Sequence, residues 1–536
     1  MALDSNPPTD LTIGAFSNHA PWLVDPKNMP WRAPVPTVRD VVRRQLPSLT
    51  RQRRLPPLGR LMVVVFHLGL AVVGWALVER RSGDRSKSRA GLSRRMRLAI
   101  ERLGPTFIKL AQIISSGEGL FPPELVNEFK KCRDQVPAEP FSAVRAVIEE
   151  DLGRPIDQVF EWIQEDALAA ASIAQVHVAK LRSGEEVVVK VQRPIVGQVV
   201  HRDLQVMSWL APFLVGRIPV VALANPPALV ELFAETITEE LDFRVEAENM
   251  LDVARTFATL DQRTYVIPRP HPRLVTRRVL VMERLSGFAF DDVVGMQEAG
   301  IDTEEIIRTG MVGFMEGAML HGIFHGDLHG GNLLVLRDGR TALLDFGITG
   351  RLNENRRKAF LRLLLSASTN NITGQLAALR DLGALPADTD LDAVIVELDL
   401  EKGPIDPTQL SPDELVEELQ RVVKALLGYG ARIPKELMLF VKNMVFLDGA
   451  ISRLAPDIDL FAEISRIAMY FATTHGETIA ADIGVDPTSV DFDFTAMKAG
   501  LGLDSSDDLA SFTYRDLQER RELIRERFAK RGASLK

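Results

Sequence analysis

The sequence has almost no cysteine and no apolar segment at its start that could act as a secretory signal. Cys132 is the only cysteine among 536 residues, so a disulfide within the chain is excluded and a reducing compartment is expected. We interpret Cys132 as a structural thiol. The first 38 residues are rich in Pro, Asn and Asp and lack the pattern of an organelle transit peptide. We therefore expect the chemistry of this chain to face the cytoplasm.

The chain also lacks internal repeats, low-complexity blocks and a surplus of positive charge. Its formal net charge is −8, which argues against a general nucleic-acid binder. Hydrophobic residues make up 46% and charged residues 25%, an ordinary balance for a large globular core. The length predicts more than one domain, or one large bilobal unit with extensions.

One long apolar run does occur, at 61–78, between basic segments at 39–60 and 80–97. The run is just long enough to span a bilayer, but its basic flanks on both sides give no orientation. A helix lying on the membrane surface, with arginines on lipid phosphates, fits both flanks better. A spanning helix and a helix buried in the protein core remain alternatives.

Helical patterns dominate the chain on either side of a short strand-rich region. The alternation of residues 176–192 around Ser183-Gly184 predicts a β-hairpin. A strand is expected at 279–285, and helices are expected at 94–116, 124–132, 141–151, 155–164, 196–260 with a break at 216–227, and in most of the chain from 303 onward, including a charged surface helix at 514–531.

The segment FHGDLHGGNLLV at 324–335 carries the sharpest chemical pattern. Asp327 and Asn332 have the D-x-x-x-x-N spacing of a kinase catalytic loop. A carboxylate in this position can act as a base toward a hydroxyl or water, and the amide oxygen can bind a metal without adding charge. Gly330 and Gly331 allow a tight turn between them.

A second pattern follows in TALLDFGITG at 341–350. An apolar strand is expected to deliver Asp345 into a Phe-Gly turn, the arrangement that binds Mg²⁺ on ATP phosphates. The intervening RDGR at 337–340 predicts a hairpin turn. A lone Asp-Phe-Gly is a weak signal, whereas both patterns at this distance strongly indicate a nucleotide site that uses ATP and Mg²⁺ or Mn²⁺.

A third pattern places Lys190 on a strand, where it is expected to hold the α- and β-phosphates. Glu246 is the best candidate for its partner on the following helix. Met282 and Glu283, at the end of the strand at 279–285, are further candidates for nucleotide contacts. His201-Arg202-Asp203-Leu204 imitates a kinase catalytic loop but lacks the matching Asn, and we interpret it as an ordinary helix start.

Three features differ from a typical protein kinase. The hairpin before Lys190 has an alanine-rich loop at 167–179 in place of a glycine-rich one. Gly326 replaces the arginine that would bind a phosphorylated activation loop. A helix cap at Leu352-Asn353-Glu354 follows Asp345 so closely that no activation segment fits. Docking of peptide substrates therefore lacks its usual platform.

These residues together resemble the UbiB/AarF/ADCK family of atypical kinase-like proteins over about residues 94–470. The family's KxGQ motif is similar to Lys109-Leu110-Ala111-Gln112, with Ala111 in place of glycine. The family's alanine-rich loop is similar to Ala169-Ala170-Ala171-Ser172. Its ExD motif is similar to Glu240-Leu241-Asp242.

The resemblance implies a helical extension over the active site, in which Lys109 and Gln112 occupy the space of a peptide substrate. Lys109 is expected to neutralise phosphate, with a catalytic role, or to pair with Glu240 and Asp242. It also implies ATPase or lipid-linked activity, membranes and isoprenoid-quinone biosynthesis. We expect no C-terminal transmembrane hairpin of the kind that many bacterial members have, because the tail from Ser489 is polar. Membrane contact would therefore fall to 61–78.

We predict an α+β, bilobal protein-kinase-like fold with an N-terminal helical extension and a mainly helical C-lobe. The expected parts are a flexible basic tail, an apolar helix with a basic linker, the extension, the N-lobe, the C-lobe and a polar tail, at 1–60, 61–93, 94–166, 167–285, 286–475 and 476–536. The expected function is an Mg-dependent ATPase or small-molecule or lipid kinase at the cytoplasmic membrane face, with an anionic or quinone-like lipid as partner. An aminoglycoside- or choline-type phosphotransferase and a nucleotide-binding pseudokinase scaffold remain alternatives.

Overall fold

The computed structural model describes residues 9–51, 55–80, 85–115, 122–132, 137–214, 226–400, 421, 425–426, 428–431, 434–485 and 512–522. Several expectations lie wholly or partly outside these residues: part of the basic segment at 39–60, most of the helix break at 216–227, and the tail at 486–511 and 523–536. The chain divides into unit 1, comprising 1–258, 266–286 and 343–348, and unit 2, comprising 259–265, 287–342 and 349–536. Each unit is described by itself.

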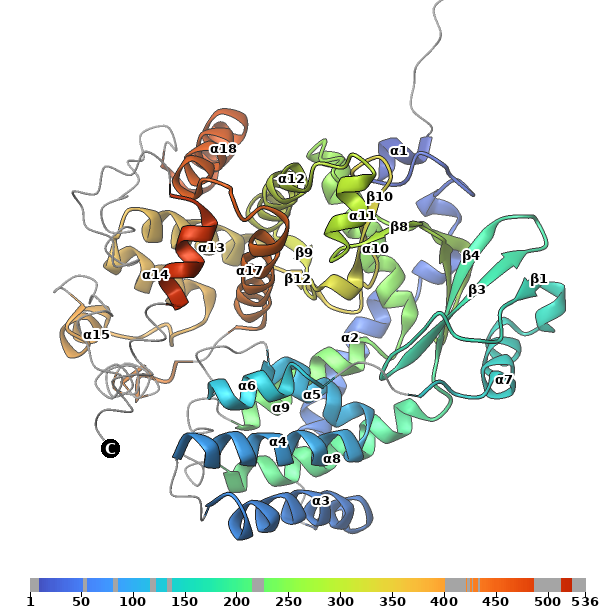
Figure 1. Ribbon diagram of the computed structural model, residues 1–536, viewed down its shortest axis with the longest axis horizontal. Coiled ribbons are helices and arrows are strands. Elements are labelled where there is room, and N and C mark those ends of the chain that lie inside the picture. Colours follow the sequence, from blue (N-terminus) through green and yellow to red (C-terminus); the bar gives the residue numbers. More distant parts are fainter. Residues whose placement is uncertain are drawn as a thin grey trace, which may run out of the picture. The chain divides into compact units, whose positions relative to one another are not determined.

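Unit 1 contains an antiparallel sheet in the order β1-β3-β4-β7-β6, with the short β2 paired to β3. Figure 1 shows its strands β1, β3 and β4. The expected hairpin is β3 and β4, and Gly184 in its turn has a φ of +108°, which glycine adopts without strain. The strands are β1 (Phe160–Ile163), β2 (Ala169–Ala170), β3 (Ala174–Leu181), β4 (Glu186–Gln192), β6 (Pro270–Val275) and β7 (Val279–Glu283).

Alternation along β4 decides which of its residues face the core. Val187, Val189 and Val191 are buried in a cluster with α7 (Phe141–Leu152) and β7. Residues between them point to the opposite face of the sheet, so Lys190 is turned away from this core.

The residues expected to be helical at 155–164 form a 3-10 turn, η4 (Ile156–Gln158), and strand β1 instead. Phe160 is buried in the core, and pairing with Leu181 of β3 makes the segment a sheet edge.

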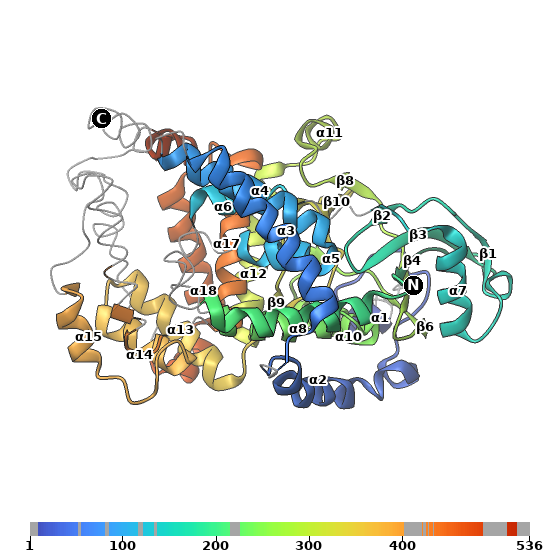
Figure 2. The ribbon, with the colours of Figure 1, turned by 90° about the horizontal axis from the view of Figure 1, so that it is seen from below.

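The rest of unit 1 is helical. Figure 2 shows α3, α4 and α8 close together, and α3 packs against α4 along its length. The elements are α3 (Leu58–Leu77), α4 (Arg85–Leu103), α5 (Pro105–Ser115), α6 (Pro123–Phe129), α8 (Val196–Leu214), α9 (Pro226–Glu239) and α10 (Phe243–Thr259). Among the described residues, α3 alone is long and apolar enough to cross a membrane, with mean hydropathy 2.0 and 17% of that stretch buried.

The N-terminal segment differs from the expected flexible tail. Residues 9–49 form α1 (Thr9–Ile13), η1 (Pro26–Asn28), η2 (Pro30–Arg32) and α2 (Val35–Leu49). Phe16, Trp31 and Val35 are buried. The segment is ordered because its side chains pack against and form hydrogen bonds with α10 and β6. Arg32 binds Glu248 through two hydrogen bonds of 2.6 Å, a bidentate geometry that composition alone does not reveal.

Unit 2 has two small sheets. One has the order β5-β11-β10-β8, and the other pairs β9 with β12. Its strands are β5 (Tyr265–Val266), β8 (Gly287–Ala289), β9 (Ile323–His325), β10 (Leu333–Leu336), β11 (Thr341–Leu343) and β12 (Thr349–Arg351). Asp338 accepts from the Arg340 backbone at 3.2 Å in the turn between β10 and β11. This is the hairpin that the RDGR segment predicts.

Helices make up most of unit 2, as expected. The helices are α11 (Val293–Glu298), α12 (Thr303–Glu316), the π-helical η6 (Gly317–His321), η7 (Gly330–Asn332), α13 (Glu354–Ser368), α14 (Ile372–Leu382), α15 (Leu391–Glu397), α17 (Lys435–Leu454) and α18 (Leu460–Ile483). Asn353 caps α13 by accepting from the Arg356 backbone at 3.0 Å, which confirms the cap expected after Asp345. Residues 514–522 are helical, and Tyr514 and Leu517 are buried, so this part of the expected polar tail packs.

Candidate active site

Three charged residues meet in unit 1, from β4, α10 and the segment after β11. Lys190 Nζ lies 2.6 Å from Glu246 Oε1 and 3.1 Å from Asp345 Oδ2. Burial by itself would lower the pKa of Lys190, but the attraction of Asp345 and Glu246 outweighs it and raises this pKa above its ordinary value. Lys190 therefore remains a cation, as a residue that binds phosphate must.

Helix α10 holds both partners of Lys190 in place. Asp242 caps this helix by accepting from the Arg244 backbone at 3.1 Å, and Glu246 lies in the first turn. One turn later, Asn249 Nδ2 donates to the Phe346 carbonyl at 3.0 Å. The same helix thus fixes the carboxylate that binds Lys190 and the backbone next to Asp345.

The expected pairing of Lys109 is found with only one of its two candidates. Lys109 on α5 lies 3.1 Å from Glu240, and both side chains are largely buried. Asp242 instead binds the guanidinium of Arg244, at 2.6 and 2.9 Å, because its place before α10 puts it within reach of a residue two positions on. Gln112 lies one turn after Lys109 on α5, and Ala111 between them is fully buried.

The alanine-rich loop forms a short strand and a tight turn. Ala169 and Ala170 make up β2, and Ala170 pairs with Gln175 of β3. The Ala171 N–H donates to the Ala174 carbonyl at 2.8 Å, and the side chain of Arg193 donates to the Ala171 carbonyl at 3.0 Å. Ser172 is buried within the turn.

Met282 and Glu283 are both buried at the end of β7. The Glu283 carboxylate accepts from Arg269 at 3.0 and 3.1 Å and also binds Ser17. Arg269 is fully buried and lies 2.6 Å from Asp10. The Glu283 side chain therefore helps to anchor the N-terminal segment. Any contact of Glu283 with a nucleotide would have to come from its backbone.

The catalytic-loop residues are in unit 2, between β9 and β10. Asp327 follows β9, and Asn332 ends η7. Asn332 Nδ2 donates to the Asp327 carbonyl at 3.0 Å, which leaves the side-chain oxygen of Asn332 to bind a cation. The Asp327 N–H donates to His325 Nδ1 at 3.2 Å. Spacing in the sequence therefore predicts the two ends of this loop and their proximity.

Two further residues of this loop come from α17 and were missed in the sequence. Lys442 forms an ion pair with Asp327. Its neighbour Asn443 is fully buried, accepts from the Leu328 N–H at 3.0 Å and donates to the His325 carbonyl. The signal was a Lys-Asn pair inside the otherwise apolar segment LMLFVKNMVFL, since buried polar groups in such a helix need partners.

The residues expected to hold a divalent metal have suitable chemistry. Among the described residues, no three His, Cys, Asp or Glu side chains cluster as a complete metal site. Asp345 and Asn332 each offer a hard oxygen donor, which Mg²⁺ prefers, and phosphate oxygens and water commonly complete its coordination. The Asp345 side chain is 43% exposed, and its Oδ1 accepts from the Gly347 N–H at 2.9 Å.

Two other expectations have structural outcomes. Asp203 of the HRDL segment is the eighth of 19 residues in α8, so the segment is not a helix start as expected. Its fully buried side chain binds Arg60 of α3 at 2.5 Å. It is a structural anchor. Cys132 lies beyond the end of α6, and burial raises its pKa to about 11, which suits a structural thiol and opposes nucleophilic use.

Comparisons with known proteins relate this chain to others. A sequence model of the ABC1 atypical kinase-like domain matches residues 131–378. An uncharacterized protein of Mycobacterium tuberculosis is 34% identical over 381 residues, which cover 69% of this chain and 76% of that protein. A solved structure of a Mycobacterium tuberculosis protein in complex with erythromycin aligns with a TM-score of 0.35 at 18% identity, over 64% of this chain and 90% of that one.

Two other relatives carry descriptive names. An uncharacterized, chloroplastic aarF domain-containing protein kinase of Arabidopsis thaliana is 32% identical over 69% of this chain and 73% of its own length. A protein of Aeromonas salmonicida named "probable protein kinase UbiB" is 32% identical over 70% of each chain. With its α+β kinase-like fold, this chain belongs to the UbiB/AarF/ADCK family of atypical kinase-like proteins.

Proposed function

We propose that the protein is an ATP-dependent atypical kinase or ATPase that acts on a small molecule or lipid. The observation that carries this proposal is the retained set of ionic residues: Lys190 pairs with Glu246 and Asp345. A scaffold without nucleotide chemistry has no need for a buried, protonated lysine beside two carboxylates. Burial of unneeded charge is costly, because each ion loses its hydration.

Each residue has a role in this proposal. Lys190 binds the phosphates and is oriented by Glu246. Asp345 and Asn332 would hold Mg²⁺, which when bound neutralises charge on the transferred phosphoryl group. Asp327 orients the attacking hydroxyl or water and accepts its proton. Lys442 orients Asp327 and adds positive charge near the reacting oxygen.

A role for Lys109 follows from its pairing. Lys109 is buried beside Glu240, so α5 is fixed in place by an ion pair that a passing protein substrate would have to break. We therefore propose little activity on generic protein substrates. The choice among hydrolysis, a lipid acceptor and a small-molecule acceptor rests on the family resemblance, as does a role near isoprenoid quinones.

Membrane association is the second part of the proposal. Leu61, Val64 and Ala71 form the buried face of α3, whereas Phe66 and Val73 lie on a face with 64% and 54% exposure. Arg60 ties α3 to Asp203, and Trp75 Nε1 donates to the Ser88 carbonyl of α4 at 3.0 Å. A helix attached to arginine-rich α4 in this way favours a position on the membrane surface over a span across it.

Two alternatives predict different outcomes. An aminoglycoside- or choline-type phosphotransferase would turn over ATP only with its soluble acceptor and would be indifferent to vesicles. A pseudokinase scaffold would bind nucleotide without turnover. The present proposal expects Mg²⁺-dependent turnover that rises with anionic vesicles.

The test is ATP turnover by the full chain, with and without vesicles of anionic phospholipid. Asp327→Asn is expected to reduce turnover on the order of 100-fold or more while nucleotide binding persists. The matched control is Asp338→Asn, an exposed aspartate in the β10–β11 turn, which should leave turnover unchanged. Equal turnover by wild type and Asp327→Asn would contradict the proposal.

A further inference from the structure

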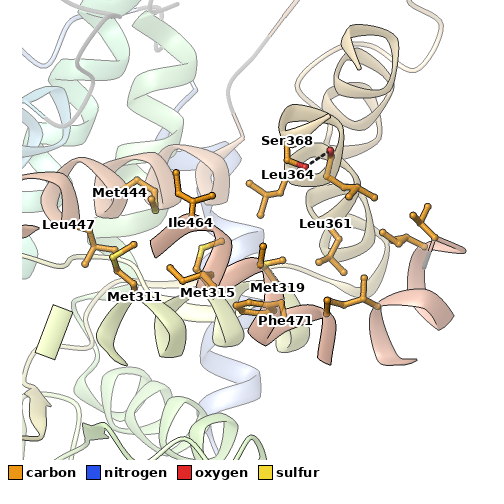
Figure 3. A pocket seen from close by; sticks show the side chains of 17 residues that line it. Met311, Met315, Met319, Leu361, Leu364, Ser368, Met444, Leu447, Ile464 and Phe471 are labelled. Carbon is orange, nitrogen blue, oxygen red and sulfur yellow. Dashed lines mark hydrogen bonds between the residues drawn. The ribbon is translucent and has the colours of Figure 1, made fainter. Parts of the chain in front are cut away.

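An apolar cavity lies within unit 2, and none of its lining residues is assigned above to nucleotide chemistry. It has a volume of about 310 Å³ and is partly open to solvent. Figure 3 shows side chains of α12, α13, α17 and α18 that point toward one another around it. The most characteristic lining residues are Met311, Met315, Met319, Met444, Leu361 and Phe471.

The chemistry of the lining excludes a polar ligand. Ser368 is the one residue with a side-chain hydroxyl in the lining, and this hydroxyl already donates to the Leu365 carbonyl at 2.8 Å. A ligand with hydrogen-bonding groups would lose its bonds to water here without replacement. Among the described residues, the lining contains no charged side chain that would select an ion.

The size and flexibility of the lining fit a hydrocarbon chain. Protein interiors rarely keep large voids, because lining atoms without neighbours lose dispersion contacts. An engineered apolar cavity of about 150 Å³ binds benzene, and this one is about twice as large. Met311, Met315 and Met319 follow at intervals of four residues on one helix face, and flexible thioethers adapt to chains of irregular shape.

Two walls of the cavity also hold the catalytic loop. Met444 lines the cavity from α17, directly after the two residues that bind Asp327 and the backbone of Leu328. The lining also includes Met319 of the π-helix η6, and this helix ends at His321 and is capped by Gly322 with a φ of +68°. Strand β9 and Asp327 follow within five residues of Gly322. A π-helix is rare and is often found at functional sites.

From these observations we infer that the cavity binds the hydrocarbon chain of a single-chain amphiphile, such as an acyl or prenyl chain. Filling the cavity fixes α17 and η6, and with them the catalytic loop between His325 and Asp327. The binding itself is independent of the proposed function. Only the idea that a fixed catalytic loop changes ATP turnover rests on the proposed function. The head group lies outside the cavity, because nothing in the lining can bind it.

Photo-cross-linking with a lauric acid that carries a diazirine at its terminal carbon tests the binding. We expect saturable labelling of peptides from α12 or α18 that unlabelled lauric acid removes. Ala468→Trp places a ring in the cavity and should weaken binding about tenfold or more. Met469→Trp, at the neighbouring position with 65% exposure, is the control and should bind as wild type does. If Ala468→Trp does not fold, Ala472→Phe narrows the same cavity with a smaller ring.

The outcomes separate this inference from its rivals. Labelling that does not saturate, that persists unchanged in the filled variants, or that maps to the exposed face of α3 would overturn it. So would a cavity already covered by another part of this chain or by a second copy, since neither leaves room for the probe. Hydrogen exchange of peptides spanning 323–330 reads the coupling without any enzymatic activity. Lauric acid should slow this exchange in wild type and Met469→Trp but not in Ala468→Trp, and equal exchange in all three would contradict the coupling. Absence of ATP turnover would count against the proposed function alone.

Discussion

At the scale of single residues, charges around the candidate site are held in pairs that join distant parts of the sequence. Asp327 and Asn332 are close in sequence, so their spacing alone predicts that they meet. Lys442 lies 115 residues from Asp327, and no local pattern connects them. Sequence reasoning therefore finds residues within one motif and misses partners that a separate helix contributes.

The first prediction concerns Lys442. Lys442→Ala removes the cation that orients Asp327, so we expect kcat to fall about tenfold to a hundredfold with little change in nucleotide affinity. Lys442→Arg should recover part of the loss, because it keeps the charge. Lys358→Ala, which removes an exposed ion pair with Glu354, is the control. A large loss of nucleotide affinity in Lys442→Ala would show that this lysine binds phosphate instead.

The second prediction concerns pH and His271 in β6. Nδ1 of His271 accepts from the Arg273 and Leu274 N–H groups at 3.0 Å each, so the ring must be neutral. Burial lowers its pKa to about 4, against about 6.5 in the unfolded chain. The unfolded state therefore binds more protons between these values, and the free energy of unfolding falls with falling pH by up to about 1.4 kcal/mol per unit.

Urea unfolding at pH 7 and pH 5 measures this effect. His271→Asn keeps an acceptor near the same backbone but does not titrate, so it should lose part of the pH dependence. His19→Asn changes an exposed histidine and should keep the dependence of wild type. An unaltered slope in His271→Asn would assign the pH dependence to other groups.

At the scale of elements, alternation and caps predict the hairpin β3–β4 and the start of α13, because each depends on neighbouring residues. The order of residues 9–49 could not be predicted in this way. Their Pro- and Asn-rich composition indicates a loose tail, but Arg32, Arg39 and Trp31 find partners on α10 and β6. Long-range contacts therefore overrule local composition, as they do for strand β1 at 160–163.

The third prediction concerns the exposed face of α3. Deleting the first 80 residues would remove packed parts of unit 1, so substitutions are the better test. Val65→Ser with Phe66→Ser should reduce sedimentation with anionic vesicles, because less apolar area enters the membrane interface. Val396→Ser removes a similarly exposed apolar residue from α15 and should bind vesicles as wild type does. Unchanged sedimentation of the double variant would place the membrane contact elsewhere.

The fourth prediction concerns the alanine-rich loop. Ala170→Gly removes a methyl group and frees the backbone of β2, so we expect the ratio of the ATP and ADP dissociation constants to change. If the substitution acts only through the greater conformational freedom of glycine, it should lower the free energy of unfolding by roughly 0.5–1 kcal/mol. Ala289→Gly, at an exposed position of strand β8, is the control for that cost. A lower melting temperature with an unchanged ratio would mean that the loop is structural.

At the scale of the whole molecule, the sequence predicted an α+β kinase-like fold from three motifs and their order. Composition could not predict the Met-lined cavity, because its lining residues are spread over the chain from Met311 to Val485. A cavity depends on how helices pack, and periodicity reports only which face of each helix is apolar.

The central claim is that Lys190, Glu246 and Asp345 form a working nucleotide site, and thermal unfolding with ADP or ATP tests it most directly. With Mg²⁺ and nucleotide at 100 times its dissociation constant, the full chain should gain about 2.7 kcal/mol of stability. EDTA or Asp345→Asn should abolish most of this gain, because the nucleotide then lacks its metal. An equal gain with and without EDTA, or no gain with Mg²⁺ at all, would contradict the account.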